Sequence, residues 1–294
     1  MMVIADAPGW VQALVLGMVQ GLTEFIPVSS SAHLVLVPSL AGWERHGLAF
    51  DVALHLGTLA ALVLYYRQDL CNMARSLIAR TPSPERDDQR RLIVLLAVAS
   101  VPVAVVGLTM GDAVESLFAA PVTTAWLLLV TALVLVGGER LHRRHLARQT
   151  PTGHDPAGVL ADPEVASDPA RERLGLRQVL IVGVAQSFAL LPGLSRSGLT
   201  ISAGIAAGMS RPAATRFAFL LGLPAIAGAA VVELPRVDDL DRITTTELLI
   251  GVSSAAVFGY LAIALLVRLV SRAGIDRFAW YVVPLSLVSL LILR

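Results

Sequence analysis

Long apolar runs separated by short polar stretches fill most of the sequence, and this pattern predicts helices that cross a membrane. A single spanning helix needs about 20 consecutive, mainly apolar residues. We therefore predict about six full transmembrane helices. They are Leu48–Tyr66, Leu92–Met110, Val122–Gly138, Phe217–Leu234, Leu248–Val270 and Ala279–Leu293.

Two further apolar runs, Trp10–Pro38 and Val179–Met209, are interrupted near their centres by proline, glycine and polar residues. Each is predicted to form two short helices that enter the membrane, turn at mid-depth and leave on the same side. Such re-entrant backbone is tolerated where protein or a wet cavity surrounds it. These two runs are called the first hairpin and the second hairpin below.

The composition supports a membrane protein. The 294 residues are 55% hydrophobic and 15% charged, whereas about 25% of the residues are charged in a typical soluble domain. We interpret residues 1–294 as a single integral membrane domain, an all-α polytopic protein. Its formal net charge is only +1, so the sequence does not point to a nucleic-acid partner.

The charge of the loops predicts how the chain is oriented. Arg67–Arg91, Arg140–Arg177 and Ser271–Arg277 are rich in arginine, whereas Gly111–Pro121 and Pro235–Glu247 are acidic on balance. The positive-inside rule places the first three in the cytoplasm and the last two outside. The first hairpin then opens to the outside and the second to the inside, so that their turns can meet near the membrane centre.

The two hairpins share a short sequence pattern. Each contains Gly-x-x-Gln followed by a proline, with Gln20 in one and Gln186 in the other, and a serine three residues after that proline. We interpret the pattern as an inverted repeat, in which discontinuous helices place a site near the midplane. The first repeat is predicted to cover residues 1–138 and the second residues 178–294, with a cytoplasmic linker loop at 139–177.

Glu24 is the main candidate in the first hairpin, where the stretch QGLTEFIPVSSSAHL begins at Gln20. Residues four apart share a helix face, so Gln20 and Glu24 are neighbours. An acidic side chain at membrane depth costs at least about 2.5 kcal/mol, which favours a functional Glu24 over a carboxylate that only caps a helix at the interface. For Gln20, an amide that packs helices together is as good an interpretation as a ligand.

Ser29, Ser30 and His33 follow within the same stretch. They supply hydroxyl groups, a candidate helix cap and an imidazole. A hydroxyl nucleophile needs an adjacent base, and that base needs an orienting partner. Ser30, His33 and Glu24 could supply these three parts.

The second hairpin contains the stretch LLPGLSRSGLT, in which Arg196 is the only charged residue between Arg177 and Arg211. Ser195 and Ser197 could cap the helix that follows the break, and the N-terminus of a helix favours anions. The planar guanidinium group binds phosphate oxygens in pairs. Arg196 lies too far from the ends of the segment to be an arginine that reaches the membrane surface.

Together the two stretches indicate a phosphate site. One offers a base, a hydroxyl and an imidazole, and the other offers a cationic, hydroxyl-rich cradle. An anion with a lipid tail, reached from within the bilayer, is the predicted substrate, because phosphoryl transfer depends on positioning and on neutralising charge.

With both stretches considered, the sequence resembles the bacterial undecaprenyl-diphosphate phosphatase family, also called bacitracin-resistance proteins. QGLTEFIPVSSSAHL is similar to the family's glutamate-rich motif, and PGLSRSGLT is similar to its PGxSRSxxT motif. The resemblance implies removal of the terminal phosphate from undecaprenyl diphosphate, which recycles the lipid carrier for peptidoglycan. It also implies inverted repeats with two re-entrant helical hairpins, located in the bacterial inner membrane with the site open to the outside.

The resemblance also implies roles for individual residues. Glu24 would be the essential acidic residue, as a base or a metal contact, and Ser30 the candidate nucleophile with His33 beside it. Arg196 would hold the diphosphate. The other residues implied to bind substrate are Gln20, Ser29, Ser195, Ser197 and Thr200.

A divalent cation, Mg²⁺ or Ca²⁺, is the cofactor that the resemblance implies. The family has Glu or Gln at the first motif position, and here it is Gln20. An amide cannot be an anionic ligand, so the sequence lacks the second carboxylate of a two-carboxylate site. Any Mg²⁺ is then expected to arrive on the diphosphate and to keep several of its waters.

Several alternatives remain open at this point. Water activated by Glu24 and a covalent phosphoserine at Ser30 are both compatible with the sequence. A phosphatase of the acid-phosphatase type is disfavoured because the chain contains no lysine. The main alternative is a transporter or flippase of an anionic prenyl lipid, and a homodimer is left open. Polar residues that we do not assign to the site are Asp51, His55, Gln186 and Glu139.

Overall fold

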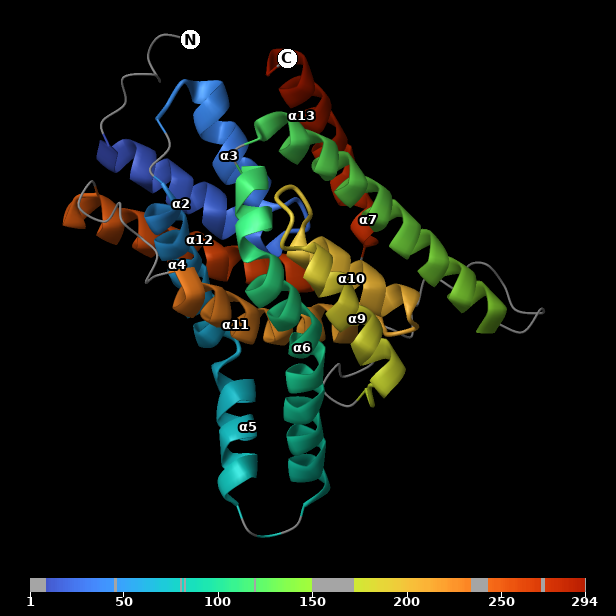
Figure 1. The fold of residues 1–294 in the computed structure, drawn as a ribbon. Coiled ribbons are helices and arrows are strands. Elements are labelled where there is room, and N and C mark those ends of the chain that lie inside the picture. Colours follow the sequence, from blue (N-terminus) through green and yellow to red (C-terminus); the bar gives the residue numbers. More distant parts are fainter. Residues whose placement is uncertain are drawn as a thin grey trace.

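The computed structural model describes residues 9–44, 47–79, 81, 83–118, 120–149, 172–233, 243–270 and 273–293, and its regular elements over these ranges are all helical. This confirms the predicted all-α class (Figure 1). The elements are α2 (Gly9–Phe25), α3 (Ser30–Ala41), α4 (Leu48–Tyr65), α5 (Arg67–Ile78), α6 (Pro84–Phe118), α7 (Pro121–Gln149), α9 (Leu176–Phe188), α10 (Arg196–Ala206), α11 (Arg211–Glu233), α12 (Thr245–Val270), the 3-10 helix η4 (Ile275–Phe278) and α13 (Ala279–Ile292).

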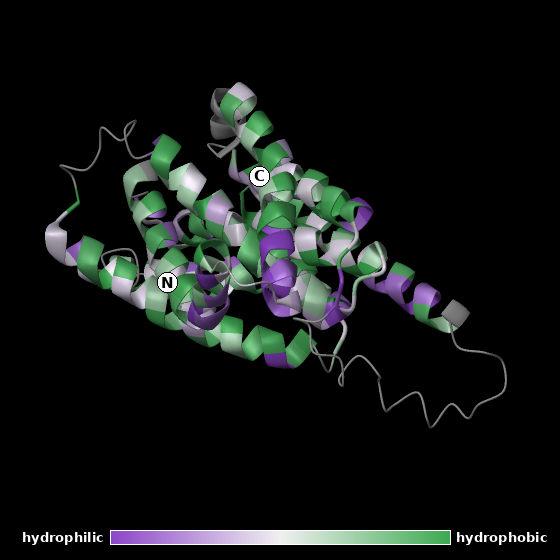
Figure 2. Ribbon diagram, turned by 90° about the horizontal axis from the view of Figure 1, so that it is seen from below, coloured by the Kyte–Doolittle hydropathy of each residue, from purple (hydrophilic) through white to green (hydrophobic). Residues whose placement is uncertain are grey.

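The prediction of about six spans is confirmed. Five helical segments among the described residues are long and apolar enough to cross a membrane: those in α6, α7, α11 and α12, and the segment formed by η4 and α13. A sixth is obtained if α4 and α5, which are bent by 72° at their junction, count as one broken span. Figure 2 shows hydrophobic residues along most of the ribbon, as a chain embedded in lipid requires.

Both predicted hairpins are pairs of short helices. The first is α2 and α3 with a break at residues 26–29, and the second is α9 and α10 with a break at residues 189–195. The breaks fall at the proline, glycine and serine clusters, because Pro27 and Pro192 have no backbone N–H to continue a helix. Gly193 has a φ of 97°, which is accessible without strain only to glycine.

Each hairpin packs against a long helix from the other half of the sequence. α2 lies along α12, and α9 lies along α6. A Cβ at Gly17 would be 2.4 Å from the carbonyl oxygen of Gly251, and one at Gly183 would be 2.6 Å from that of Ala99. Small residues at such contacts let helix backbones approach closely within a membrane. The crossed pairing is what an inverted repeat would produce, while the boundaries at 1–138 and 178–294 remain a prediction.

The predicted loops are shorter in the structure. α7 continues as a helix to Gln149, so the linker predicted to begin at residue 139 does not begin there. Glu139 holds this extension in place, because its buried carboxylate accepts hydrogen bonds from Arg211 and Arg143. Residues 150–171 of the linker lie outside the described residues.

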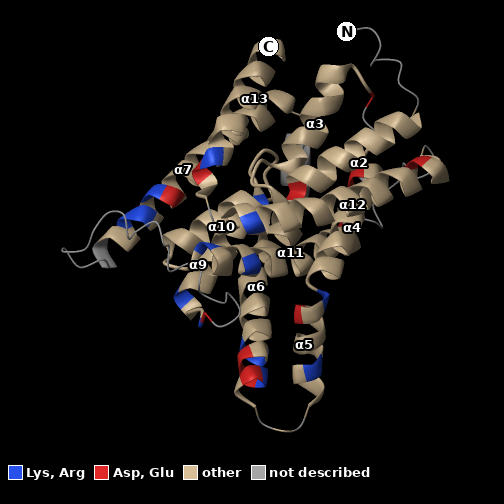
Figure 3. Cartoon of the chain, turned by 180° about the vertical axis from the view of Figure 1, so that it is seen from behind, with Lys and Arg blue, Asp and Glu red and all other residues tan. Residues whose placement is uncertain are grey.

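The arginine-rich stretch at 67–91 is also mainly helical. It forms α5 and the first turns of α6, which project together from the rest of the molecule (Figure 1). Charged residues gather on this projection and on the last turns of α7 (Figure 3).

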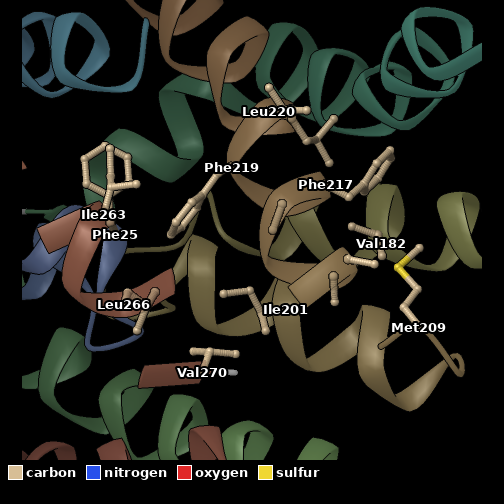
Figure 4. Packing of buried hydrophobic residues seen from close by; sticks show 14 of the residues in the cluster. Phe25, Val182, Ile201, Met209, Phe217, Phe219, Leu220, Ile263, Leu266 and Val270 are labelled. Atoms are coloured by element: carbon tan, nitrogen blue, oxygen red, sulfur yellow. The ribbon is translucent and has the colours of Figure 1, made fainter. Parts of the chain in front are cut away.

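A continuous apolar core joins the two hairpins to the spanning helices (Figure 4). Phe25 at the end of α2 meets Phe219 of α11 edge to face, with ring centroids 5.5 Å apart. Ile201 of α10 and Leu266 of α12 are fully buried in the same cluster. Phe25 directly follows Glu24, so this packing anchors the end of α2 that carries the carboxylate.

Candidate active site

Glu24 is the centre of the candidate site, where the ends of the two hairpins meet. Its side chain is only 5% exposed, and its Oε1 accepts a hydrogen bond from Arg196 Nη2 at 2.7 Å. Its Oε2 accepts hydrogen bonds from Ser30 Oγ at 2.5 Å and from Gln20 Nε2 at 3.1 Å. The structure therefore brings together four of the predicted site residues, one of them 172 positions from Glu24 in the sequence.

Arg196 is the first residue of α10 and reaches across to the first hairpin. Its guanidinium lies against the backbone of α11 at Gly222, where an added Cβ would be 2.0 Å from Arg196 Nη1. Gly222 therefore makes room for the Arg196 side chain, which the sequence did not predict. The sequence feature that could have indicated it is a glycine within an apolar helix, because small residues let neighbouring groups approach such a helix closely.

Ser29 sets the geometry of the first break. It is the only described residue other than glycine with a positive φ, at 69°. Its Oγ accepts a hydrogen bond from the backbone N–H of Ala32 at 3.4 Å and so caps α3. With Ser29 occupied in this cap, Ser30 is the hydroxyl that points back to Glu24. Ser29 thus positions Ser30, and its assigned contact with substrate remains a prediction.

His33 is buried but turned away from the Glu24 carboxylate. Its Nδ1 is 2.7 Å from the backbone oxygen of Ser29, and its Nε2 is 2.9 Å from the hydroxyl of Tyr281 on α13. The two rings are stacked with centroids 5.7 Å apart. The expected chain of Ser30, His33 and Glu24 is therefore corrected, because Ser30 bonds to Glu24 directly and His33 anchors the turn.

The hydroxyls of the second hairpin hold their own loop together. Ser195 Oγ caps α10 through the N–H of Gly198 at 3.1 Å and lies 3.2 Å from Ser197 Oγ. Ser197 Oγ also donates to the carbonyl of Ile26 at 3.3 Å, which joins the two breaks. Thr200 Oγ1 donates to the carbonyl oxygen of Arg196 within its own helix at 2.7 Å.

Thr131 of α7 is a second residue that the sequence reading missed. Its hydroxyl donates to the carbonyl of Gly193 at 2.8 Å and accepts from the N–H of Ser195 at 3.1 Å. It therefore braces the loop that carries Arg196. A threonine in an apolar span is too common to have indicated this role.

Of the polar residues that we left unassigned, one lies at the site. His55 of α4 has its Nε2 3.6 Å from Glu24 Oε2. Glu139 instead pairs with Arg211 at 2.6 Å, away from the hairpin ends. Gln186 is 1% exposed, and its side-chain amide has no protein hydrogen-bond partner among the described residues.

Comparison with known proteins identifies the family. The model of the family described as bacitracin resistance protein BacA matches residues 13–288. This chain belongs to the BacA family. The match covers the second hairpin, all but the first residues of the first hairpin, and every residue assigned to the site.

Curated BacA relatives are similar to this chain over nearly their full length. An undecaprenyl-diphosphatase of Geobacter metallireducens is 41% identical over 92% of this chain and 93% of its own. Those of Thermomicrobium roseum and Gemmatimonas aurantiaca are 41% and 42% identical, over 96% and 94% of this chain and 97% and 95% of their own.

A cation held by the protein alone does not fit the donor set of this BacA chain. No group of three His, Cys, Asp or Glu side chains among the described residues is arranged to hold a metal. Both oxygens of Glu24 already accept hydrogen bonds, and Gln20 offers a neutral amide where a second carboxylate would be needed. The expected Mg²⁺ or Ca²⁺ remains a prediction.

Proposed function

We infer that this protein hydrolyses undecaprenyl diphosphate to undecaprenyl phosphate and inorganic phosphate, which recycles the lipid carrier for peptidoglycan synthesis and gives bacitracin resistance. The relatives that cover almost all of the chain carry the name undecaprenyl-diphosphatase. The observation that carries the proposal is the buried contact of Arg196 and Ser30 with one carboxylate, that of Glu24.

The ion pair suggests how substrate enters the reaction. A diphosphate offers Arg196 several anionic oxygens, which can replace Glu24 as its partner. Glu24 is then released from the cation and becomes a proton acceptor beside Ser30. Binding of the anion and activation of the base are therefore coupled through one hydrogen bond.

The chemistry that follows has two forms, and both use Glu24 as the base. In one, Glu24 accepts the proton of Ser30, whose oxygen attacks the terminal phosphorus and displaces undecaprenyl phosphate, after which water hydrolyses the phosphoserine. In the other, Glu24 accepts the proton of a water that attacks the phosphorus directly, and Ser30 only orients the carboxylate. In both, Arg196 neutralises the charge on the transferred group.

We propose that the site opens to the extracytoplasmic side of the bacterial inner membrane. The support is the charge distribution, because arginine gathers on α5, on the first turns of α6 and on the last turns of α7 (Figure 3). Any Mg²⁺ or Ca²⁺ would reach the site on the diphosphate and would add to the neutralisation that Arg196 supplies.

Phosphate release from undecaprenyl diphosphate by the purified protein in detergent tests the proposal. We expect Glu24→Gln and Arg196→Ala to lower kcat by about 10²-fold to 10⁴-fold, because one loses the base and the other the charge on the phosphate. Arg144→Ala, which removes an exposed arginine outside the site, is the matched control and should retain wild-type activity. Circular dichroism and gel filtration check that each variant is folded.

The transporter or flippase is the second candidate, and the crossed packing of the hairpins favours it. A folded wild type that releases no phosphate with either metal, yet moves a fluorescent prenyl phosphate across liposomes, would replace the hydrolase by this function.

A further inference from the structure

We propose that His55 is a proton relay, which carries the proton accepted by Glu24 out to solvent and so resets the site after each turnover. The proposal deepens the proposed hydrolysis and rests on it. It assigns a role to a residue that lies on neither hairpin and belongs to neither of the two motifs.

The need for such a group follows from the proton balance. Water supplies two hydrogens, one of which stays on the phosphate product or is lost from it, while the other passes to Glu24 when the nucleophile is deprotonated. Glu24 must lose this proton before it can act again. With a side chain that is 5% exposed, the carboxylate has little direct contact with solvent.

Among the described residues that contact Glu24, only His55 can take up a proton. Arg196 remains protonated and offers donors alone. Ser30 and Gln20 are neutral groups that do not hold an extra proton at ordinary pH. An imidazole changes its charge near neutral pH and is the usual side chain for such transfers.

The orientation of the His55 ring suits the transfer. Its Nδ1 is 2.7 Å from the backbone oxygen of Asp51, and a carbonyl can only accept a hydrogen bond. Nδ1 therefore carries hydrogen in the neutral ring, which leaves the lone pair of Nε2 facing Glu24 Oε2 at 3.6 Å. Direct transfer needs a shortening of about half an ångström, or one bridging water. Such a shift becomes available when Arg196 turns to the phosphate and releases Glu24.

His55 also lies on a route out of the site. Its side chain is 31% exposed, against 5% for Glu24. His55 is seven residues from the start of α4 at Leu48, which corresponds to about 10 Å along a helix. Asp51 lies one turn nearer to that start on the same face. Glu24, His55 and Asp51 thus form a series of proton-carrying side chains from the buried site toward the surface where the first hairpin enters.

The titratable residues that could interact with the His55 ring from neighbouring helices lie on α2, α5, α11 and α12, which pack against α4. Glu24 is the acidic side chain within ion-pair distance of its Nε2. Arg216 of α11 pairs with Asp69 on α5, and Tyr260 of α12 packs on Tyr65 at the far end of α4. The remaining titratable residues on the helices packed against α4 are Arg211 and Glu233 on α11, Glu247 and Arg268 on α12, and Arg67, Cys71 and Arg75 on α5.

The proton transfers balance. The proton moves from the attacking oxygen to Glu24 Oε2 as the new P–O bond forms and the bridging P–O bond breaks. It then moves to His55 Nε2, which gives an imidazolium and a free carboxylate. The imidazolium finally loses a proton to solvent, and both residues return to their starting states.

The test compares wild type with His55→Gln and His55→Ala in phosphate release from undecaprenyl diphosphate. A relay acts after the first chemical event, so rapid mixing of excess substrate with His55→Gln should give a burst of undecaprenyl phosphate equal to the enzyme concentration. Steady-state kcat should then be lower by about 10-fold to 100-fold, and KM should fall with it, because kcat/KM reports only the steps up to the first irreversible one, which precedes the relay. Imidazole added to His55→Ala should restore kcat in a saturable way. His145→Ala, which removes a histidine outside the site, is the control.

Each other outcome overturns the relay. Wild-type kcat in folded His55→Gln across the pH range would show that another route resets Glu24. A raised KM with an unchanged kcat would make His55 a substrate contact. A lowered kcat without a burst and without rescue by imidazole would make its role structural. Failure of the wild type itself to release phosphate would instead count against the proposed hydrolysis.

Discussion

The two hairpins are built alike and supply oppositely charged side chains to the candidate site. In the first hairpin, Glu24 ends the entering helix and Ser30 begins the next, so that a carboxylate and a hydroxyl face each other across the break. In the second hairpin, Arg196 begins α10, while Ser195 and Thr200 bond to their own backbone. The comparison teaches that two hairpins of similar build place a carboxylate at one break and a guanidinium at the other, in contact with each other.

The glutamines at matching positions, Gln20 and Gln186, have different surroundings in the two hairpins. Gln20 donates to Glu24 four residues later. Gln186 stands at the matching place in α9, but the residue four positions after it is Leu190. Its amide is buried without a protein partner among the described residues. The repeated pattern thus preserves an amide in both hairpins, whereas the carboxylate that uses it is present in only one.

Among variants outside the two hairpins, the largest effect on kcat is expected from Gly222→Ala. This change displaces the Arg196 guanidinium without altering the sequence of either hairpin. The new Cβ would be 2.0 Å from Arg196 Nη1, so the guanidinium must move away from Glu24. A displacement of about 1 Å at a reacting group can cost about 10²-fold in rate. We therefore expect kcat for phosphate release to fall by about that factor.

Gly228→Ala is the matched control, because it lies on the same helix and a Cβ there meets nothing within 4 Å. We expect it to keep wild-type kcat and to raise the free energy of unfolding by about 0.5–1 kcal/mol, since alanine favours helix over glycine. Equal kcat in the two variants would show that the contact of Arg196 with α11 does not position the cation.

The sequence was enough to predict the spans, the two breaks and the meeting of Glu24 with Arg196. These depend on strong local signals: long apolar runs, proline and glycine at the breaks, and charges at membrane depth. The two polar clusters also lie in hairpins that are predicted to enter from opposite faces, and this topology predicts that the clusters meet.

The same reasoning could not predict which polar groups touch. His33 was assigned to Ser30 because the two are close in sequence, but its ring instead pairs with Tyr281, a residue 248 positions away. Gly222 and His55 lie on spanning helices whose rotation depends on packing against distant segments. Rotation about a helix axis has no signature in an apolar run, since hydrophobic residues cover all of its faces.

Ser30→Ala and Ser195→Ala each remove one hydroxyl, the first from the first hairpin and the second from the second. Their effects on kcat are expected to be of intermediate size. Ser30 bonds to Glu24, so its loss should lower kcat at least about tenfold with a small change in stability. Ser195 caps α10, so its loss should lower the free energy of unfolding by about 1 kcal/mol and reduce kcat less. Phosphate release and unfolding in mixed detergent micelles measure the two effects. The opposite ranking of the two kcat values would place the reactive hydroxyl on the second hairpin.

The smallest effect is expected from Gln186→Leu, which removes the unused amide. A buried polar group without a partner costs about 1–3 kcal/mol, and leucine has a similar volume, so the free energy of unfolding should rise by about 1 kcal/mol with kcat unchanged. Gln20→Leu is the counterpart, and it should lower both stability and kcat because Glu24 loses a donor. The pair is measured by unfolding in mixed micelles and by phosphate release. A loss of stability in Gln186→Leu would show that the Gln186 amide makes a stabilising contact. The glutamines of the two hairpins would then have similar structural roles.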